Sequence, residues 1–297
     1  MHLHLKELEQ ESIEIIRKTY ADSIKPVVLY SIGKDSSVLL QLFKKAFYPN
    51  QVPVEFLHID TTWKFKEMIN FRDKLMQQEN LNYKIFTNQE GVKKNINPFD
   101  HDFYTDTMKT EALKEALNVG KYDFIYGGAR RDEEKSRSKE RIVSQRDKNH
   151  TWNPKNQRIE PWNIFNTKHV VNHSFRIFPL SNWTELNIWE YIKQEKIDIV
   201  PLYFAKKRKV VEKLTGEIFL LDDDRYKFQK GDKISELVVR FRTLGCYPLT
   251  AAIKSEAVNL DQIIEEVSSA KYSERYGRVI DYDTEASMEL KKKQGYF

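Results

Sequence analysis

Short apolar runs alternate with longer amphipathic stretches through the first two thirds of the chain. The apolar runs predict strands at 26–31, 54–60, 83–88 and 122–128. Helical spacing of apolar residues predicts helices at 3–20, from about 37 to 47, at about 64–79 and at 106–118. Strands that alternate with helices form βαβ units, which build a mostly parallel sheet flanked by helices. The pattern therefore predicts an α/β fold.

The pattern weakens after this part of the chain. Residues 140–175 are polar and aromatic without a clear period, which predicts a long functional or mobile loop. A strand is then predicted to run to Pro179, followed by a helix with Asn182 as its cap and Glu185 completing a capping box. The C-terminal third is predicted to be irregular, with a short helix at 261–269. We expect a nucleotide-binding domain over 1–200 and an extension over 201–297 that packs on it.

Composition narrows the class of protein. The 297 residues are 40% hydrophobic and 31% charged, and no apolar run is long enough to cross a membrane. The N-terminus lacks the apolar region of a signal peptide, and the single cysteine cannot form an internal disulfide, so a cytoplasmic protein is expected. The net charge of +5 is small and mixed along the chain. It does not indicate a nucleic-acid-binding protein, and a local pocket for phosphate or sulfate fits better.

Candidate chemistry follows the predicted strands, where ligands bind in sheets of this kind. The segment SIGKDSS joins the first strand to a helix. Gly33 lets the backbone approach a ligand, Lys34 adds a positive charge, and the free N–H groups at the helix start attract anions. The segment lacks both the Walker A and the dinucleotide-binding spacing. It predicts a cradle for pyrophosphate, although a plain strand–helix turn is the alternative. The other polar side chains of this predicted cradle are Ser31, Asp35, Ser36 and Ser37.

An arginine-rich segment follows the fourth strand. Gly127 and Gly128 free the backbone, and planar guanidinium groups match the oxygens of phosphate or sulfate. The arginines of this segment are Arg130, Arg131, Arg137 and Arg141. On one helix, the first, third and fourth would share a face. The alternative is a solvated helix whose arginines pair with neighbouring glutamates.

Other residues leave two interpretations open. Asp60 could bind ribose, adenine or a metal, or it could cap a helix. Arg240 and Arg242 could form a second anion clamp or interior salt bridges. His58 is predicted to be packed in a strand, and Cys246 to be a buried, inert thiol. The histidines and the single cysteine show no zinc-site spacing, so no resident metal is predicted.

The segment SIGKDSS resembles the PP-loop of the ATP pyrophosphatases, which bind the β- and γ-phosphates of ATP there and cut between the α- and β-phosphates. Ile32 stands where most members have a glycine, as in the sulfate-activating subgroup. Other stretches resemble the small-subunit family of the heterodimeric sulfate adenylyltransferases across nearly the whole chain. These include HIDTTWKFKEM, GGARRDEEKSRSKER, FPLSNWTELNIWEYI, VRFRTLGCYPLT and SMELKKKQGYF. The resemblance implies a Rossmann-like, adenine nucleotide alpha-hydrolase-like fold.

The same resemblance implies a nucleotidyltransferase that converts ATP and sulfate to adenylyl sulfate and pyrophosphate, the first step of sulfate assimilation towards cysteine. ATP is then a substrate, Mg²⁺ accompanies it, and no redox cofactor is bound. The implied partner is a GTPase large subunit in a heterodimer or a higher assembly. Lys34 is expected to stabilise the leaving pyrophosphate, while Arg130, Arg131 and Arg137 hold sulfate.

Two other functions remain open. Phosphoadenylyl-sulfate reductases share the fold and a similar loop, but they need a nucleophilic cysteine near the C-terminus. The tail QGYF has none. A non-catalytic nucleotide-binding regulator is the third possibility, and the presence of Lys34 and Asp35 argues against it.

Overall fold

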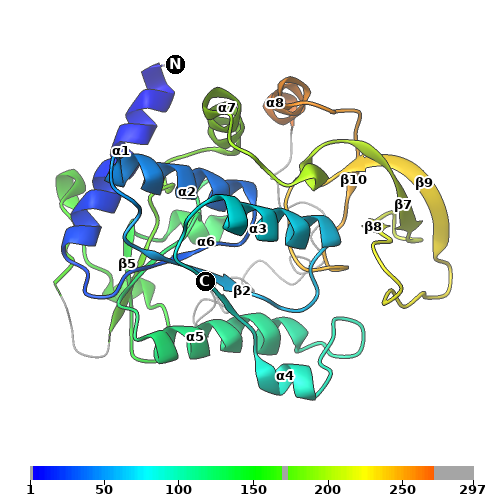
Figure 1. Cartoon of the computed structure of the whole chain (residues 1–297), viewed down its shortest axis with the longest axis horizontal. Coiled ribbons are helices and arrows are strands. Elements are labelled where there is room, and N and C mark those ends of the chain that lie inside the picture. Colours follow the sequence, from blue (N-terminus) through cyan, green and yellow to red (C-terminus); the bar gives the residue numbers. More distant parts are fainter. Residues whose placement is uncertain (1–2, 169–172, 271–297) are drawn as a thin grey trace.

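A six-stranded sheet forms the centre of the first part of the protein. The computed structural model describes residues 3–168 and 173–270. The sheet has the order β3-β2-β1-β4-β6-β5, and only β5 runs antiparallel to its neighbour, so the predicted α/β class is confirmed (Figure 1). The strands are β1 (Val27–Leu29), β2 (Glu55–Ile59), β3 (Tyr83–Phe86), β4 (Phe124–Tyr126), β5 (Val143–Arg146) and β6 (Ser174–Ile177).

Helices cover both faces of this sheet, as the continuous apolar strands predict. Alternate residues of β1 point to opposite sides: Val27 packs in a cluster with Leu113 and Leu117 of α5, whereas Val28 joins the main core on the other face. Figure 1 shows α1, α2, α3 and α7 on one side and α4 and α5 on the other. The helices are α1 (Leu3–Ala21), α2 (Lys34–Phe47), α3 (Lys66–Gln78), α4 (Gln89–Lys93), α5 (Ala112–Gly120), α6 (Lys135–Ser138), α7 (Glu185–Glu195) and α8 (Leu260–Ser269), and a π-helical turn (Asp106–Glu111) leads into α5.

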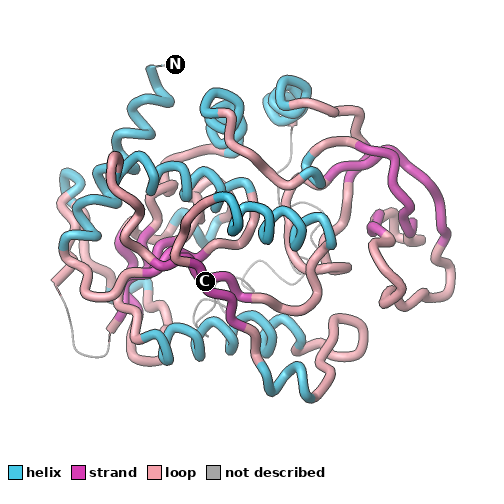
Figure 2. Tube along the Cα trace, in the orientation of Figure 1, coloured by secondary structure: helices cyan, strands magenta, loops and turns pink. Residues whose placement is uncertain are grey.

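A second, antiparallel sheet follows where an irregular extension was predicted, so that expectation was wrong. Its order is β10-β9-β7-β8, and Figure 2 shows it apart from the first sheet. In β7, three exposed lysines and the buried Arg208 precede the buried Val210 and Val211, so the strand does not alternate apolar and polar residues. The strands are β7 (Lys206–Glu212), β8 (Ile218–Leu220), β9 (Lys233–Arg240) and β10 (Ile253–Lys254). One hydrophobic core includes residues of both parts, so the extension packs closely on the first part.

Three local predictions were also wrong. The predicted loop at 140–175 contains β5, whose polar sequence VSQR hides its buried pairing with β6. Helix α7 is capped by Thr184 in a capping box with Asn187, while Asn182 binds Arg131. Helix α6 has only four residues, so the arginines of that segment do not share one helical face. For β5 and for Asn182, a contact distant in sequence overrode the local signal.

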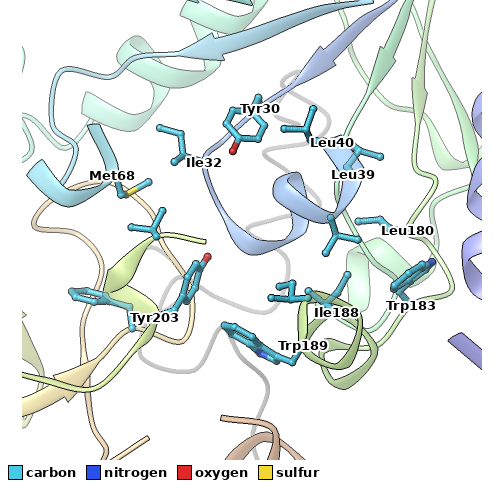
Figure 3. Packing of buried hydrophobic residues seen from close by; sticks show 14 of the residues in the cluster. Tyr30, Ile32, Leu39, Leu40, Met68, Leu180, Trp183, Ile188, Trp189 and Tyr203 are labelled. Atoms are coloured by element: carbon cyan, nitrogen blue, oxygen red, sulfur yellow. The ribbon is translucent and has the colours of Figure 1, made fainter. Parts of the chain in front are cut away.

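The bend after β1 is formed by Ile32 and not by Gly33. Ile32 has a φ of 68°, in the left-handed region that β-branched residues avoid, whereas Gly33 has an ordinary φ of −82°. The side chain of Ile32 is fully buried in the main core, as Figure 3 shows together with Met68 and Tyr203. Backbone strain costs about 1–3 kcal/mol at such a position. Burial of an isoleucine contributes about 1.5–3 kcal/mol, which offsets this strain.

Candidate functional site

A cavity of about 250 Å³ opens at the carboxyl ends of β1, β2 and β4. The strand order reverses between β1 and β4, and in open parallel sheets this is where ligands bind. The cavity is lined by the loop after β1, the end of β2 and the segment after β4. The second part of the chain adds Tyr203 and residues 243–246. Lys109 and Leu113, from the π-helical turn and α5, complete the lining. Three of the lining segments are the ones singled out by their position after a strand.

The loop after β1 places most of its predicted residues in the cavity wall. Ser31, Gly33, Lys34, Asp35 and Ser36 line the cavity, together with the predicted Gly127 and Gly128. The backbone N–H of Lys34 donates to the Tyr203 hydroxyl at 2.9 Å, which ties the start of α2 to the second part of the chain. Ser37 does not line the cavity; its hydroxyl donates to the Gly33 carbonyl at 3.2 Å.

Gly128 is required by close packing. A Cβ atom there would lie 3.2 Å from the backbone carbon and the Cβ of Asp35, which is tighter than ordinary contact. The segment after β4 therefore lies directly against the loop after β1. This contact brings Arg130 to Asp35.

Asp35 holds two buried cations. Its carboxylate lies 2.7 Å from the Arg130 Nε and 3.1 Å from the Lys34 Nζ. Burial raises the pKa of Asp35, but the charges of Lys34 and Arg130 outweigh it, so the pKa is held below its usual value. Asp35 is therefore a carboxylate that positions both cations beside the cavity.

Only one of the four predicted arginines lines the cavity. Arg137 does so, with its guanidinium 3.7 Å from Glu134 and 4.0 Å from Glu140. Arg130 is almost fully buried behind Asp35, and Arg131 donates to Asn182 at 2.7 Å. Arg141 is exposed. Two of the four, Arg130 and Arg137, are thus paired with acidic side chains, as in the alternative interpretation. They do not share the helix that this interpretation assumed.

Asp60 is neither a helix cap nor part of the cavity lining. Its carboxylate accepts from the Thr62 N–H at 2.8 Å and from the Arg72 guanidinium at 3.1 Å, and α3 begins only at Lys66. Burial raises the pKa of Asp60, but these hydrogen bonds and the nearby positive charges outweigh that effect. The net pKa is therefore below its usual value. The carboxylate thus shapes the loop that carries Thr61 and Lys64 into the cavity wall.

Arg240 and Arg242 also form ion pairs within the protein. Arg240 is buried and lies 2.6 Å from Glu266, and Arg242 lies 2.7 Å from Glu185. Neither lines the cavity. Their predicted binding of the nucleotide stays a prediction, while the salt-bridge alternative describes the observed contacts.

Cys246 is not as buried as predicted, while its predicted lack of reactivity stays a prediction. The thiol is half-buried in the cavity wall, 3.3 Å from the Thr61 hydroxyl. Burial raises its pKa, but the positive charges of Lys64 and Lys109 outweigh it and the net shift is downward. These lysines come from other elements, so the sequence around Cys246 could not reveal them. Lys64 alone had a signal, since it lies in HIDTTWKF at the end of β2.

His58 is packed, as predicted. It is 1% exposed, and its Nδ1 donates to the Tyr30 carbonyl at 2.8 Å. Burial lowers the pKa of His58 to about 4, so the ring is neutral near pH 7. It shapes the cavity wall without adding charge.

The described residues contain neither a group of metal-ligating side chains nor a helix that could span a membrane. Within 3–168 and 173–270, no group of three or more histidine, cysteine or acidic side chains could hold a metal ion. None of the helices in those ranges combines the length and the apolar character needed to span a bilayer.

The family comparison defines the class first. Residues 25–252 match the family model of the phosphoadenosine phosphosulfate reductase domain. This range includes both sheets' strands up to Ala252 and every segment that lines the cavity. The chain therefore belongs to this domain family, and the matched range contains the cavity.

Curated relatives narrow the class further. The sulfate adenylyltransferase subunit 2 of Sulfurimonas denitrificans is 57% identical over 99% of this chain and 97% of its own length. The protein of that name from Aliivibrio fischeri is 56% identical over 99% of this chain and 98% of its own. That from Saccharophagus degradans is 57% identical over 99% and 97%. The chain belongs to the sulfate adenylyltransferase subunit 2 family.

Proposed function

We propose that this protein is the catalytic subunit of a sulfate adenylyltransferase, which converts ATP and sulfate to adenylyl sulfate and pyrophosphate. The observation that carries the proposal is the buried Lys34 at the start of α2, in the cavity wall of a chain closely related to subunit 2 over its full length. A lysine and a helix N-terminus together suit the phosphates of ATP. The adenine ring fits the apolar part of the cavity, lined by Leu29, Leu57, Ile59 and Leu113.

The reaction needs positioning and charge stabilisation more than acid–base chemistry. A sulfate oxygen forms a bond to the α-phosphorus, while the bond from that phosphorus to the bridging oxygen breaks and its electron pair leaves with pyrophosphate. Sulfate is already an anion, so no general base is required. Lys34 stabilises the negative charge that develops on the leaving group. Asp35 keeps Lys34 and Arg130 in place through its two ion pairs.

Mg²⁺ is expected to enter with ATP. The cavity has two carboxylates in its described lining, Asp35 and Glu133, and Asp35 already holds two cations. These residues fit an ion that is ligated mainly by phosphate oxygens. Bound there, Mg²⁺ would neutralise part of the triphosphate charge.

A partner subunit follows from the relatives, which are named subunit 2. We propose that the partner is a GTPase large subunit in a heterodimer or a higher assembly, in the cytoplasm. The phosphate–sulfate anhydride is high in energy, so formation of the product needs a driving reaction. GTP hydrolysis by the partner would supply it. We also propose that 1–200 forms the nucleotide-binding domain and 201–297 its packed extension.

A pyrophosphate-release assay tests the proposal. ATP is supplied with and without sulfate, and the large subunit and GTP are added in parallel reactions. We expect pyrophosphate release that depends on sulfate and increases with GTP. Absence of sulfate-dependent release under all of these conditions would refute the proposed activity.

A further inference from the structure

The cavity has a second positively charged wall, formed by residues outside the loop after β1. Lys64 follows β2 and Lys109 lies on the π-helical turn, and both side chains line the cavity half-buried. Among the described lining residues, four cationic side chains face two carboxylates. Lys34 is already paired with Asp35, so its charge is partly neutralised. Lys64 and Lys109 therefore add positive charge to the part of the cavity wall outside the loop after β1.

The segments that carry this wall are held rigidly together. The Tyr104 hydroxyl donates to the Thr61 carbonyl at 3.0 Å. The Tyr247 N–H donates to the Trp63 carbonyl at 2.9 Å, and the two rings stack with centroids 6.0 Å apart. The first contact joins the loop after β2 to the segment before the π-helical turn, and the second joins it to Tyr247, directly after the loop at 243–246. A pre-organised wall of this kind is suited to bind a small anion.

The Cys246 thiol reports the electrostatic potential at this wall. It lies 3.3 Å from the Thr61 hydroxyl, and the fields of both lysines reach it. Burial alone would raise the pKa of the thiol, yet the net shift is downward. The wall therefore favours a negatively charged group beside Thr61, Lys64 and Lys109.

We propose that Lys64 and Lys109, with the Thr61 hydroxyl, form the subsite for the attacking oxyanion, sulfate. This inference rests on the proposed function. The triphosphate repels a sulfate dianion, so cations that the phosphates do not occupy must hold it. Arg130 and Arg131, predicted for this role, do not line the cavity. Two ammonium groups and a hydroxyl fit a tetrahedral oxyanion, which needs no planar fork.

Steady-state kinetics give the first test. Lys64→Gln and Lys109→Gln each remove one charge with little change in length. We expect each to raise the KM for sulfate by at least about tenfold, while the KM for ATP changes by less than about threefold. Lys66→Gln is the matched control, because Lys66 is exposed, close in sequence and outside the cavity lining. An unchanged sulfate KM in both cavity variants would overturn the subsite.

Labelling of Cys246 gives a second test that does not require turnover. Cys246 is the only cysteine, so alkylation by iodoacetamide reports this site alone. With a non-hydrolysable ATP analogue bound, sulfate should slow alkylation at least about threefold relative to sodium chloride of equal ionic strength. The effect should persist in Lys66→Gln and disappear in Lys64→Gln and Lys109→Gln.

The two tests separate the subsite from the proposed activity. Protection by sulfate without any turnover would support the anion subsite and refute adenylyl transfer. Turnover with an unchanged sulfate KM and no protection would refute the subsite and leave the activity standing. Circular dichroism of each variant confirms folding, and Lys109→Gln keeps the inference testable if Lys64→Gln is unstable.

Discussion

The central prediction concerns Asp35, whose carboxylate joins the two halves of the phosphate site. Asp35→Asn keeps the size of the side chain but removes its charge. The side chains of Lys34 and Arg130 are only 2% and 1% exposed. In the variant, the negative charge that Asp35 places between these two cations would be missing. Removing one partner of a buried ion pair costs about 3–5 kcal/mol. Asp35 is 26% exposed, and Arg130 keeps Asp132 at 3.5 Å, so we expect the lower end of that range.

A loss of about 3 kcal/mol corresponds to a fall in Tm of roughly 6–12 °C, at about 2–4 °C per kcal/mol for a chain of this order of size. The variant should also lose at least about tenfold in sulfate-dependent pyrophosphate release, because Lys34 is no longer held in place. Differential scanning calorimetry and the pyrophosphate assay measure the two effects. Asp73→Asn is the control, since that ion pair is half-exposed and contributes about 1 kcal/mol or less.

A second substitution identifies the cause. If the cost arises from an uncompensated charge, Lys34→Met in the Asp35→Asn background should restore part of the lost stability while activity stays low. A double variant that is less stable than Asp35→Asn would contradict this explanation. Full stability and full activity in Asp35→Asn itself would refute the positioning role of the carboxylate.

Four further predictions address other features of the site. Lys34→Ala should lower sulfate-dependent pyrophosphate release at least about tenfold, because the charge on the leaving group loses its contact; unchanged turnover would exclude that role. Cys246→Ser should keep the adenylyltransferase activity within about threefold, whereas a reductase mechanism that uses this thiol would be abolished. His58→Asn should flatten the pH dependence of stability: the folded pKa of His58 is about 4, below the unfolded value of about 6.5, so its contribution is complete above about pH 6.5 and is lost as the pH falls towards 4. Urea unfolding at several pH values measures this, and an equally steep profile in the variant would argue against it. Ile32→Gly should be more stable than Ile32→Ala, because both lose the buried side chain but only glycine relieves the positive φ, which costs other residues about 1–2 kcal/mol; thermal unfolding in the reverse order would contradict the strain at this bend.

The parallel character of the central sheet and the position of the cavity at its strand ends could be predicted from the sequence. Strands such as Val27–Leu29 are continuously apolar because both faces of a parallel sheet are buried, and this pattern is local. The polar segments that follow such strands meet at one edge of the sheet. For this reason the loop at 31–37 and the glycines at 127–128 could be assigned to one site before any contact was known. The resemblance to a family added the reaction.

Only the tertiary structure decided which charged side chains face the cavity. Ion pairs depend on distances between elements that are far apart in sequence, so Arg130 turned to Asp35 and Arg240 to Glu266. Long-range packing also places Cys246 in the cavity wall near Lys64 and Lys109, whose positive charges act on its thiol. The second sheet was not predicted, because many residues of β7 and β9 are exposed and these strands lack a continuous apolar pattern. Local patterns therefore located the site, and long-range packing and charge pairing determined its chemistry.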